Sequence, residues 1–387
     1  MSKSEKKTPE LRFKGFTQDW EQRQLGDHAV YRRGSFPQPY GNKEWYDGDG
    51  AMPFVQVVDV TDRLVLVDDT KQKISKLAQS KSVFVPKGTV VVTLQGSIGR
   101  VAITQYDAFV DRTLLIFEDY EKLTDKHFWS YIIQQKFEIE KQKAPGGTIK
   151  TITKEALSSF EVLLPEYEEQ QKIGSFFKQL DQLITLHQRK YTALSQLKKA
   201  YLQNLFPSNG ESVPKLRFAN FSGNWEKRKL NTVIDVNSGR DYKHLSEGDI
   251  PVYGTGGYML SVNEALSYNE DAVGIGRKGT IDKPFLLRAP FWTVDTLFYA
   301  IPKEKYDLNF LYSIFQRINW KQKDESTGVP SLSKATINGV SVKVPKSEEQ
   351  IRIGHYLREF DTLIIQHQQK IEQLKELKQA YLQKLFV

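Results

Sequence analysis

The sequence predicts an α+β protein built from two copies of one plan, in which a globular region with a mixed sheet is followed by a long helix. Residues 165–207 align without a gap with residues 345–387, and residues 9–25 align with residues 214–230. Between these repeated segments, short β-rich runs are separated by loops that contain glycine and proline. A repeat of this length indicates two structurally equivalent halves.

Each copy of the longer repeat is predicted to be one continuous helix. Both copies begin with proline and an acidic first turn, and both are rich in Leu, Gln, Lys and Glu. Their apolar positions alternate in steps of three and four, which is the pattern of a coiled-coil seam. An additional step of three at Leu194 and Leu197 predicts local overwinding. A rod of ~60 Å is too long to be covered by one small globule, so the simplest partner for each helix is the other copy.

The polar residues of these helices have a structural interpretation. His187 and His367 lie on the predicted seam, where a polar residue more often sets register than performs chemistry. The Glu168–Glu169 and Glu348–Glu349 pairs are interpreted as charges at helix starts rather than as catalytic carboxylates. The chain has no cysteine, its six histidines are not at metal-ligand spacing, and it has neither a Walker A motif nor a serine nucleophile elbow. We therefore expect no metal site and no catalytic residues.

Composition restricts the class of protein further. The chain has 55 Lys and Arg residues against 47 Asp and Glu residues, a net charge of +8, which mildly favours a polyanionic partner. No run of 18 apolar residues is present, and the N-terminal MSKSEKKT lacks the apolar core of a signal peptide. The absence of cysteine fits a reducing compartment. We expect a cytoplasmic protein without a membrane partner.

The predicted organisation has four parts. Residues 1–164 form the first globular domain, 165–207 a helix, 208–344 the second globular domain and 345–387 a second helix. The linker from Pro207 to Ser212 has the composition of an exposed boundary. In the first domain we expect strands at 54–58, 89–94, 100–103 and 113–117 and a helix at 124–142. In the second we expect strands at 232–236, 250–253, 272–275 and 297–301 and a helix at 308–320.

Three glycine-containing loops in each half carry polar and basic residues. Glycine allows the backbone to approach a ligand closely, Arg and Lys can bind phosphate or guanine, and Gln and Asn can bind adenine. The alternative is a set of tight turns with solvated charges, but matching loops in both halves favour a shared binding face. The three pairs are 31–35 with 237–243, 94–100 with 274–280, and 145–150 with 327–333, and a further loop, 253–258, occurs only in the second half.

One glycine motif does not predict a nucleotide site. Gly274, Gly276 and Gly279 match the spacing of the dinucleotide fingerprint. That fingerprint requires a helix to begin at the motif, so that its N-terminus can bind the pyrophosphate. The residues that follow, 280–284, read TIDKP, which is not a helix start.

The repeated motifs together resemble the specificity subunit of type I restriction–modification enzymes, in the form found in Gram-positive bacteria. They are P-x-L-R-F-x-x-F followed by W-E, E-E-Q-x-x-I-G leading through L-D-x-L-I and H-Q to L-K-x-A-Y-L-Q-x-L-F, and the loops Arg240–His244 and Tyr253–Gly257. The resemblance covers nearly the whole chain. It implies that each globular region is a target recognition domain for one half of a split DNA site. It also implies that the two helices form an antiparallel coiled coil, which spaces the domains and gives the chain a pseudo-two-fold repeat.

The resemblance further implies partners whose cofactors this chain does not bind. Two modification subunits would use S-adenosylmethionine to methylate adenine N6, and two restriction subunits would use ATP and Mg. The subunit itself would be non-catalytic, which agrees with the absence of methyltransferase and ATPase motifs. On this interpretation, the residues expected to face double-stranded DNA are Arg32, Arg33, Gln95, Ser97, Arg100 and Lys150 in the first half, and Arg240, Tyr242, Lys243, Tyr253, Thr255, Arg277, Lys278 and Ser331 in the second.

Two other classes of function stay open at this point. One is a coiled-coil adaptor whose loops bind proteins, for which DNA affinity would not fall steeply with salt. The other is an enzyme with an unrecognised site, against which the missing catalytic clusters argue.

Overall fold

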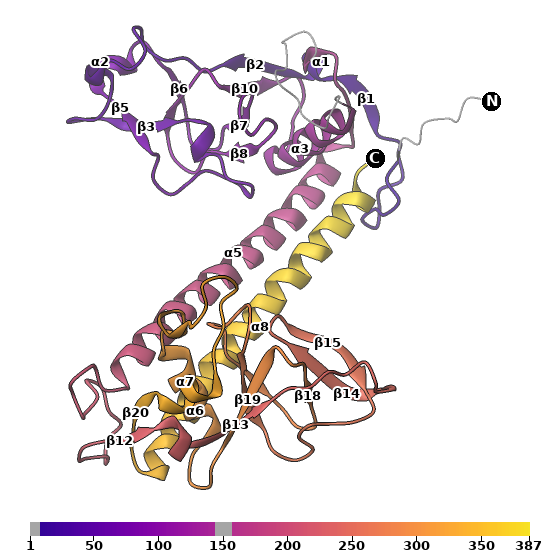
Figure 1. The fold of residues 1–387 in the computed structure, drawn as a ribbon. Coiled ribbons are helices and arrows are strands. Elements are labelled where there is room, and N and C mark those ends of the chain that lie inside the picture. Colours follow the sequence, from indigo (N-terminus) through magenta and orange to yellow (C-terminus); the bar gives the residue numbers. More distant parts are fainter. Residues whose placement is uncertain (1–7, 144–156) are drawn as a thin grey trace. The chain divides into compact units, whose positions relative to one another are not determined.

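The computed structural model describes residues 8–143 and 157–387, and it divides into two compact units. Unit 1 comprises Met1–Leu186 with Lys370–Val387, and unit 2 comprises His187–Gln369. The two long helices, α5 (Tyr167–Asn204) and α8 (Ser347–Leu385), each contribute one part to each unit. Both predicted helices are therefore confirmed, and Figure 1 shows each as a continuous ribbon.

Unit 1 contains a five-stranded sheet, a four-stranded sheet and a two-stranded ribbon. Most neighbours are antiparallel, but the pairs β3–β9 and β4–β8 are parallel, so the sheets are mixed as predicted. The strand orders are β2 (Ala29–Arg33), β10 (Leu114–Tyr120), β7 (Val90–Thr93), β8 (Val101–Ile103), β4 (Leu64–Val65); β5 (Gln72–Ile74), β3 (Met52–Val55), β9 (Ala108–Val110), β6 (Val83–Val85); and β1 (Glu21–Gln24), β11 (Glu161–Leu164). Within residues 8–143 the α-helices are α1 (Leu25–His28), α2 (Lys76–Gln79) and α3 (Lys126–Lys143).

Unit 2 repeats this plan with smaller sheets. Its only parallel pair among the described strands is β14–β18. The strand orders are β13 (Ile234–Ser238), β19 (Leu297–Pro302), β16 (Ala272–Gly276), β17 (Phe285–Leu287); β15 (Gly257–Val262), β14 (Glu247–Gly254), β18 (Trp292–Thr293); and β12 (Glu226–Lys229), β20 (Ser341–Val344). The helices are α6 (Leu308–Arg317) and α7 (Lys334–Gly339).

The expected apolar strands and both expected helices of the globular regions are present, with shifts of a few residues at their ends. The polar strands β1 and β12 were not predicted, because EQRQ and EKRK show no apolar alternation. They form because each pairs antiparallel with the strand that leads into a long helix, β11 or β20. Tertiary pairing overrides local propensity here.

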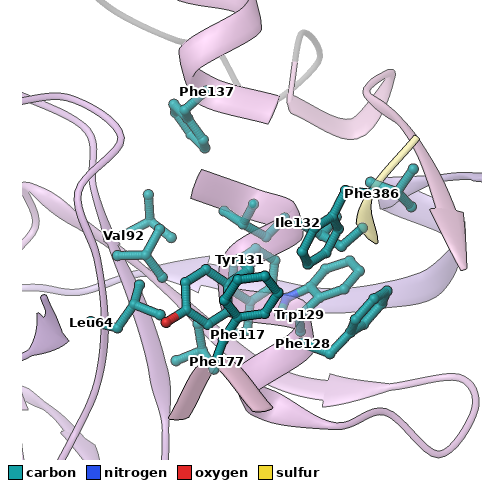
Figure 2. Packing of buried hydrophobic residues seen from close by; sticks show 14 of the residues in the cluster. Leu64, Val92, Phe117, Phe128, Trp129, Tyr131, Ile132, Phe137, Phe177 and Phe386 are labelled. Atoms are coloured by element: carbon teal, nitrogen blue, oxygen red, sulfur yellow. The ribbon is translucent and has the colours of Figure 1, made fainter. Parts of the chain in front are cut away.

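The core of each unit is completed by the end of a long helix. In unit 1, Phe386 stacks on Phe128 of α3 with ring centroids 5.5 Å apart, beside the buried Trp129 and Phe177 (Figure 2). In unit 2, Phe206, just beyond the end of α5, stacks in the same way on Phe310 of α6 at 5.3 Å. Each globular region is therefore packed against the C-terminal end of the helix that follows the other region in the chain.

Within both units the two long helices run antiparallel, and their seam contains paired charges. Lys198 Nζ lies 2.5 Å from Asp361 Oδ1 in unit 2, and Lys378 Nζ lies 2.6 Å from Asp181 Oδ1 in unit 1. The predicted overwinding is wrong: Leu197 is 45% exposed, and the adjacent lysine is buried in the seam instead. A lysine stem can fill an apolar position while its ammonium group meets a carboxylate, so the steps of three and four continue unbroken.

Two other predictions for the helices are confirmed in part. His187 and His367 meet in the seam, with their Nδ1 atoms 2.8 Å apart. Glu169 and Glu349 lie in the first helical turns, but both are buried rather than solvated. Their carboxylates each bind an arginine of the repeated leading segment through two hydrogen bonds, as described next.

The joint between helix and globular region explains why the same residues recur in the two leading segments and the two helix starts. In unit 1, Arg12 donates to both oxygens of Glu169, at 2.9 and 2.6 Å. The next residue, Gln170, accepts a hydrogen bond from the backbone of Asp125, whose carboxylate caps α3. A Cβ atom at Gly174 would lie 2.0 Å from that carboxylate, so only glycine fits. Unit 2 repeats all these contacts with Arg217, Glu349, Gln350, Asp307 and Gly354.

Candidate nucleic-acid interface

One turn in each unit organises the loops that were predicted to bind. We call it the central turn: Val110–Leu114 in unit 1 and Thr293–Leu297 in unit 2. It leads into β10 in unit 1 and into β19 in unit 2. In the sheet, β10 lies between β2 and β7, and β19 lies between β13 and β16. The first predicted loop of each unit is at the end of β2 or β13, and the second is at the end of β7 or β16. The backbone of the turn therefore lies next to the ends of both neighbouring strands.

In unit 2, three predicted loops are attached directly to the central turn. The attachments involve the backbone only, so they fix loop positions without using side chains. They run from Gly239 N to Leu297 O at 3.0 Å, from Arg240 N to Thr293 O at 2.8 Å, from Arg277 N to Thr296 O at 2.8 Å and from Val294 N to Tyr253 O at 3.0 Å.

The fourth loop of unit 2, 327–333, is attached to the second. Gly279 N donates to Pro330 O at 2.8 Å, and Leu332 N donates to Arg277 O at 2.9 Å. Asp324 stabilises the loop, because its carboxylate accepts a hydrogen bond from the backbone amide of Ser331 at 2.9 Å. This hydrogen bond lowers the pKa of Asp324. All four loops of unit 2 thus meet around one turn, as the shared-face prediction requires.

Unit 1 has the same arrangement for its first two loops. The attachments are from Gly34 N to Leu114 O at 3.1 Å, from Ser35 N to Val110 O at 2.9 Å and from Leu94 N to Thr113 O at 2.8 Å. The third predicted loop of this half, with Lys150, lies outside the described residues.

Two equivalent glycines allow the first loop to approach the turn. A Cβ atom at Gly34 would lie 2.3 Å from Val110 O, and a Cβ atom at Gly239 would lie 2.0 Å from Val294 O. No side chain can be accommodated at such distances from a carbonyl oxygen. The glycines of the first loop pair are therefore required by packing against the central turn.

The candidate residues of unit 1 are exposed but do not all share one surface. Arg32 and Arg33 are consecutive residues of β2, so their side chains leave opposite faces of the sheet. Arg32 lies 3.8 Å from Glu118. Gln95, Ser97 and Arg100 are exposed in the second loop, where an Arg100 nitrogen also contacts Val60 O at 3.4 Å.

In unit 2, the candidates separate into exposed cations and half-buried groups. Arg277 is held with its guanidinium 5.8 Å from the ring of Phe298 and donates to Asp295 O at 3.3 Å. Tyr242 and Tyr253 pack partly into the core, so they support the loops as well as border the surface. The exposed cations are Arg240, Lys243, Arg277 and Lys278, and the half-buried residues are Tyr242, Tyr253, Thr255 and Ser331.

Sequence reasoning missed the residue at the apex of the central turn. This residue is Arg112 in unit 1 and Asp295 in unit 2, and both are exposed. No glycine marks the turn, and it lies between two apolar strands, so it carries no loop signal. Both turns contain the sequence Val-Asp, and an alignment on these letters would pair Asp111 with Asp295. The backbone hydrogen bonds instead pair Arg112 with Asp295.

The described residues offer little for other classes of site. Within residues 8–143 and 157–387, no group of three or more His, Asp or Glu side chains could hold a metal ion. Nor does any helix in these ranges combine the length and apolar composition needed to cross a bilayer.

Comparison with known proteins shows a family match over both halves. Residues 17–196 and 222–376 match the sequence profile described as "Type I restriction modification DNA specificity domain". The MjaVIII type I restriction enzyme specificity subunit of Methanocaldococcus jannaschii is 21% identical over 401 residues, which covers 93% of this chain and 90% of the relative. The EcoprrI specificity subunit of Escherichia coli is 19% identical over 358 residues, with coverage of 86% and 85%.

A solved structure has the same fold. The S subunit of a type I restriction–modification system from M. genitalium matches with a TM-score of 0.73 at 18% identity. The match covers 98% of this chain and 99% of that one.

Proposed function

Because the chain belongs to the family of type I restriction–modification DNA specificity subunits, we propose that its two units each read one half of a bipartite DNA site. Specificity subunits of this family recognise DNA sequence and have no catalytic activity of their own. The observation that carries the proposal for this chain is the central turn. The equivalent turn holds loops of different sequence in the two units. A repeated scaffold can therefore read a target whose two half-sites differ in sequence.

The charge of the candidate face supports a polyanionic ligand. In unit 2, Arg240, Arg277 and Lys278 lie on loops that hydrogen-bond to one another or to the central turn, and all three are exposed. Arginine and lysine at such positions can neutralise phosphates or bind guanine in the major groove. A reader with two recognition regions would contact half-sites roughly one helical turn, ~34 Å, apart on one side of the duplex.

We further propose that the chain recruits two modification subunits, which use S-adenosylmethionine to methylate adenine N6, and through them two restriction subunits that use ATP and Mg. The duplicated joint between helix and globular region supports a stoichiometry of two, because it presents the same residues twice. These partners act on DNA in the cytoplasm, where the complex would serve host defence.

The first experiment is to map adenine methylation in cells that express the chain with its cognate modification subunit and in cells that lack the chain. A split motif with a fixed unspecified gap, present only with the chain, is the expected result. Methylation that is unchanged when the chain is removed would refute the specificity role.

A second experiment separates DNA recognition from the adaptor alternative. We expect the affinity of the assembled complex for target DNA to fall steeply with salt. The variants Arg240→Ala and Arg277→Ala should each weaken binding by ~1–3 kcal/mol if the side chain reads a base. A phosphate contact would instead weaken binding to all sequences alike. Unchanged affinity and preference in both variants would remove these loops from the interface.

A further inference from the structure

We infer that the apex residue of each central turn reads one base pair of its half-site, with Arg112 binding guanine and Asp295 accepting a hydrogen bond from the amino group of cytosine. This inference rests on the proposed function and names two residues that share one structural position but have opposite charge.

The equivalence of the two positions follows from backbone hydrogen bonds. In unit 1, Thr113 O accepts from the second loop, and in unit 2, Thr296 O does so. The residue immediately before each threonine is therefore the same point of the fold, Arg112 or Asp295. Asp111 has another role: it is buried, and its carboxylate accepts from the amide and hydroxyl groups of Thr113 at 2.9 and 2.6 Å.

Both apex side chains keep their polar groups available. Neither forms a hydrogen bond or an ion pair through its side chain with another residue in 8–143 or 157–387. The guanidinium of Arg112 lies 4.5 Å from the ring centre of Phe36, in the segment that follows the first loop. Stacking of this kind orients a guanidinium while its N–H donors remain free for the O6 and N7 acceptors of guanine.

The carboxylate of Asp295 lies next to loops that carry the exposed cations Arg240 and Arg277, and the first loop also carries a carboxylate, that of the exposed Asp241. Asp295 lies on a turn attached to the loops of Arg240 and Arg277, and Arg277 donates to the backbone oxygen of Asp295. A carboxylate that faced a phosphate would be repelled, which would weaken DNA binding at every sequence. A carboxylate that faces the major-groove edge can accept from the N4 amino group of cytosine, which is the donor that this base presents there.

The turn is also rigid enough to position a base contact. Its carbonyl oxygens accept from two loops, and Gly34 or Gly239 packs against it without space for a side chain. Because the backbone of the turn is already held, binding does not have to order the turn itself. The loops around it differ between the units, whereas the turn keeps its geometry and changes only its chemistry.

The test uses the complete complex in cells and measures the methylated fraction at every adenine site. Asp295→Asn and Arg112→Gln are expected to relax one position each, in opposite halves of the motif. Loss of a base contact should reduce discrimination at that position on the order of 10-fold or more. Each variant controls for the other, because the half-site that it does not touch should keep its wild-type preference.

Glu304→Gln is a matched charge control. This exposed carboxylate lies beyond the end of β19 that is opposite the central turn. We expect its motif to equal that of the wild type. An unchanged motif in both apex variants, or a uniform loss of methylation at all sites without a change of motif, would overturn the inference. If methylation by wild-type complex does not depend on the chain at all, the proposed function itself fails.

Discussion

The repeated arginine of the leading segment should be essential for the stability of unit 1. Glu169 is 1% exposed and Arg12 is 15% exposed, and the two form a bidentate pair. The substitution Arg12→Ala leaves a buried carboxylate with the indole N–H of Trp20 as its remaining side-chain donor, at 3.2 Å. Breaking a buried pair from one side costs ~3–5 kcal/mol. Water can partly replace the half-open arginine, so we expect a loss near the lower limit, about 3 kcal/mol.

The measurement is urea unfolding of the purified full-length chain, followed by tryptophan fluorescence and circular dichroism. Arg23→Ala is the matched control, because Arg23 is 18% exposed, much like Arg12, but its ion-pair partners among the described residues are Glu21 and Glu121, which are 52% and 55% exposed. Because these carboxylates stay solvated when the arginine is removed, the loss of their ion pairs should cost at most about 1 kcal/mol. The double substitution Arg12→Ala with Glu169→Gln removes the buried charge and should recover about 1–2 kcal/mol relative to Arg12→Ala alone. Equal losses for Arg12→Ala and Arg23→Ala, or no recovery in the double variant, would refute the reasoning.

Three further stability effects follow from the same contacts. Gly239→Ala places a Cβ atom 2.0 Å from a carbonyl oxygen, so calorimetry should show a loss of ~1–3 kcal/mol, whereas Gly256→Ala, with no atom within 4 Å, should match the wild type. Lys198→Ala leaves the seam with an unpaired, partly solvated aspartate and should cost about 1–2 kcal/mol in urea unfolding; a change below ~0.5 kcal/mol would show that the pair is dispensable. Trp20→Phe removes a hydrogen bond to a buried carboxylate, whereas Trp225 Nε1 has no partner among the described residues. In urea unfolding, Trp20→Phe should therefore lower the free energy of unfolding by about 1–2 kcal/mol more than Trp225→Phe does, and equal losses would contradict this account.

The repeated frame of this protein can be predicted from its amino-acid sequence. The gap-free repeat of 165–207 in 345–387 predicted two equivalent helices, and their apolar spacing predicted a seam. The apolar runs predicted the central strands, because alternation and β-branched residues are local signals. The glycine-containing loops identified the edge of each sheet at which candidate residues gather. These features depend on residues close together in the chain, so one sequence contains them.

Features that depend on partners far apart in the chain could be seen only once the chain was folded. Lys198 occupies the seam because Asp361 meets its ammonium group, and apolar spacing alone selected Leu197 instead. The polar strand β12 exists because β20 pairs with it. The apex position was hidden because the letters Val-Asp suggest one register, whereas the backbone hydrogen bonds of the central turn define another. Pairing across long sequence separations sets register, burial and which side chain reaches the surface, and none of these is encoded in the spacing of neighbouring residues.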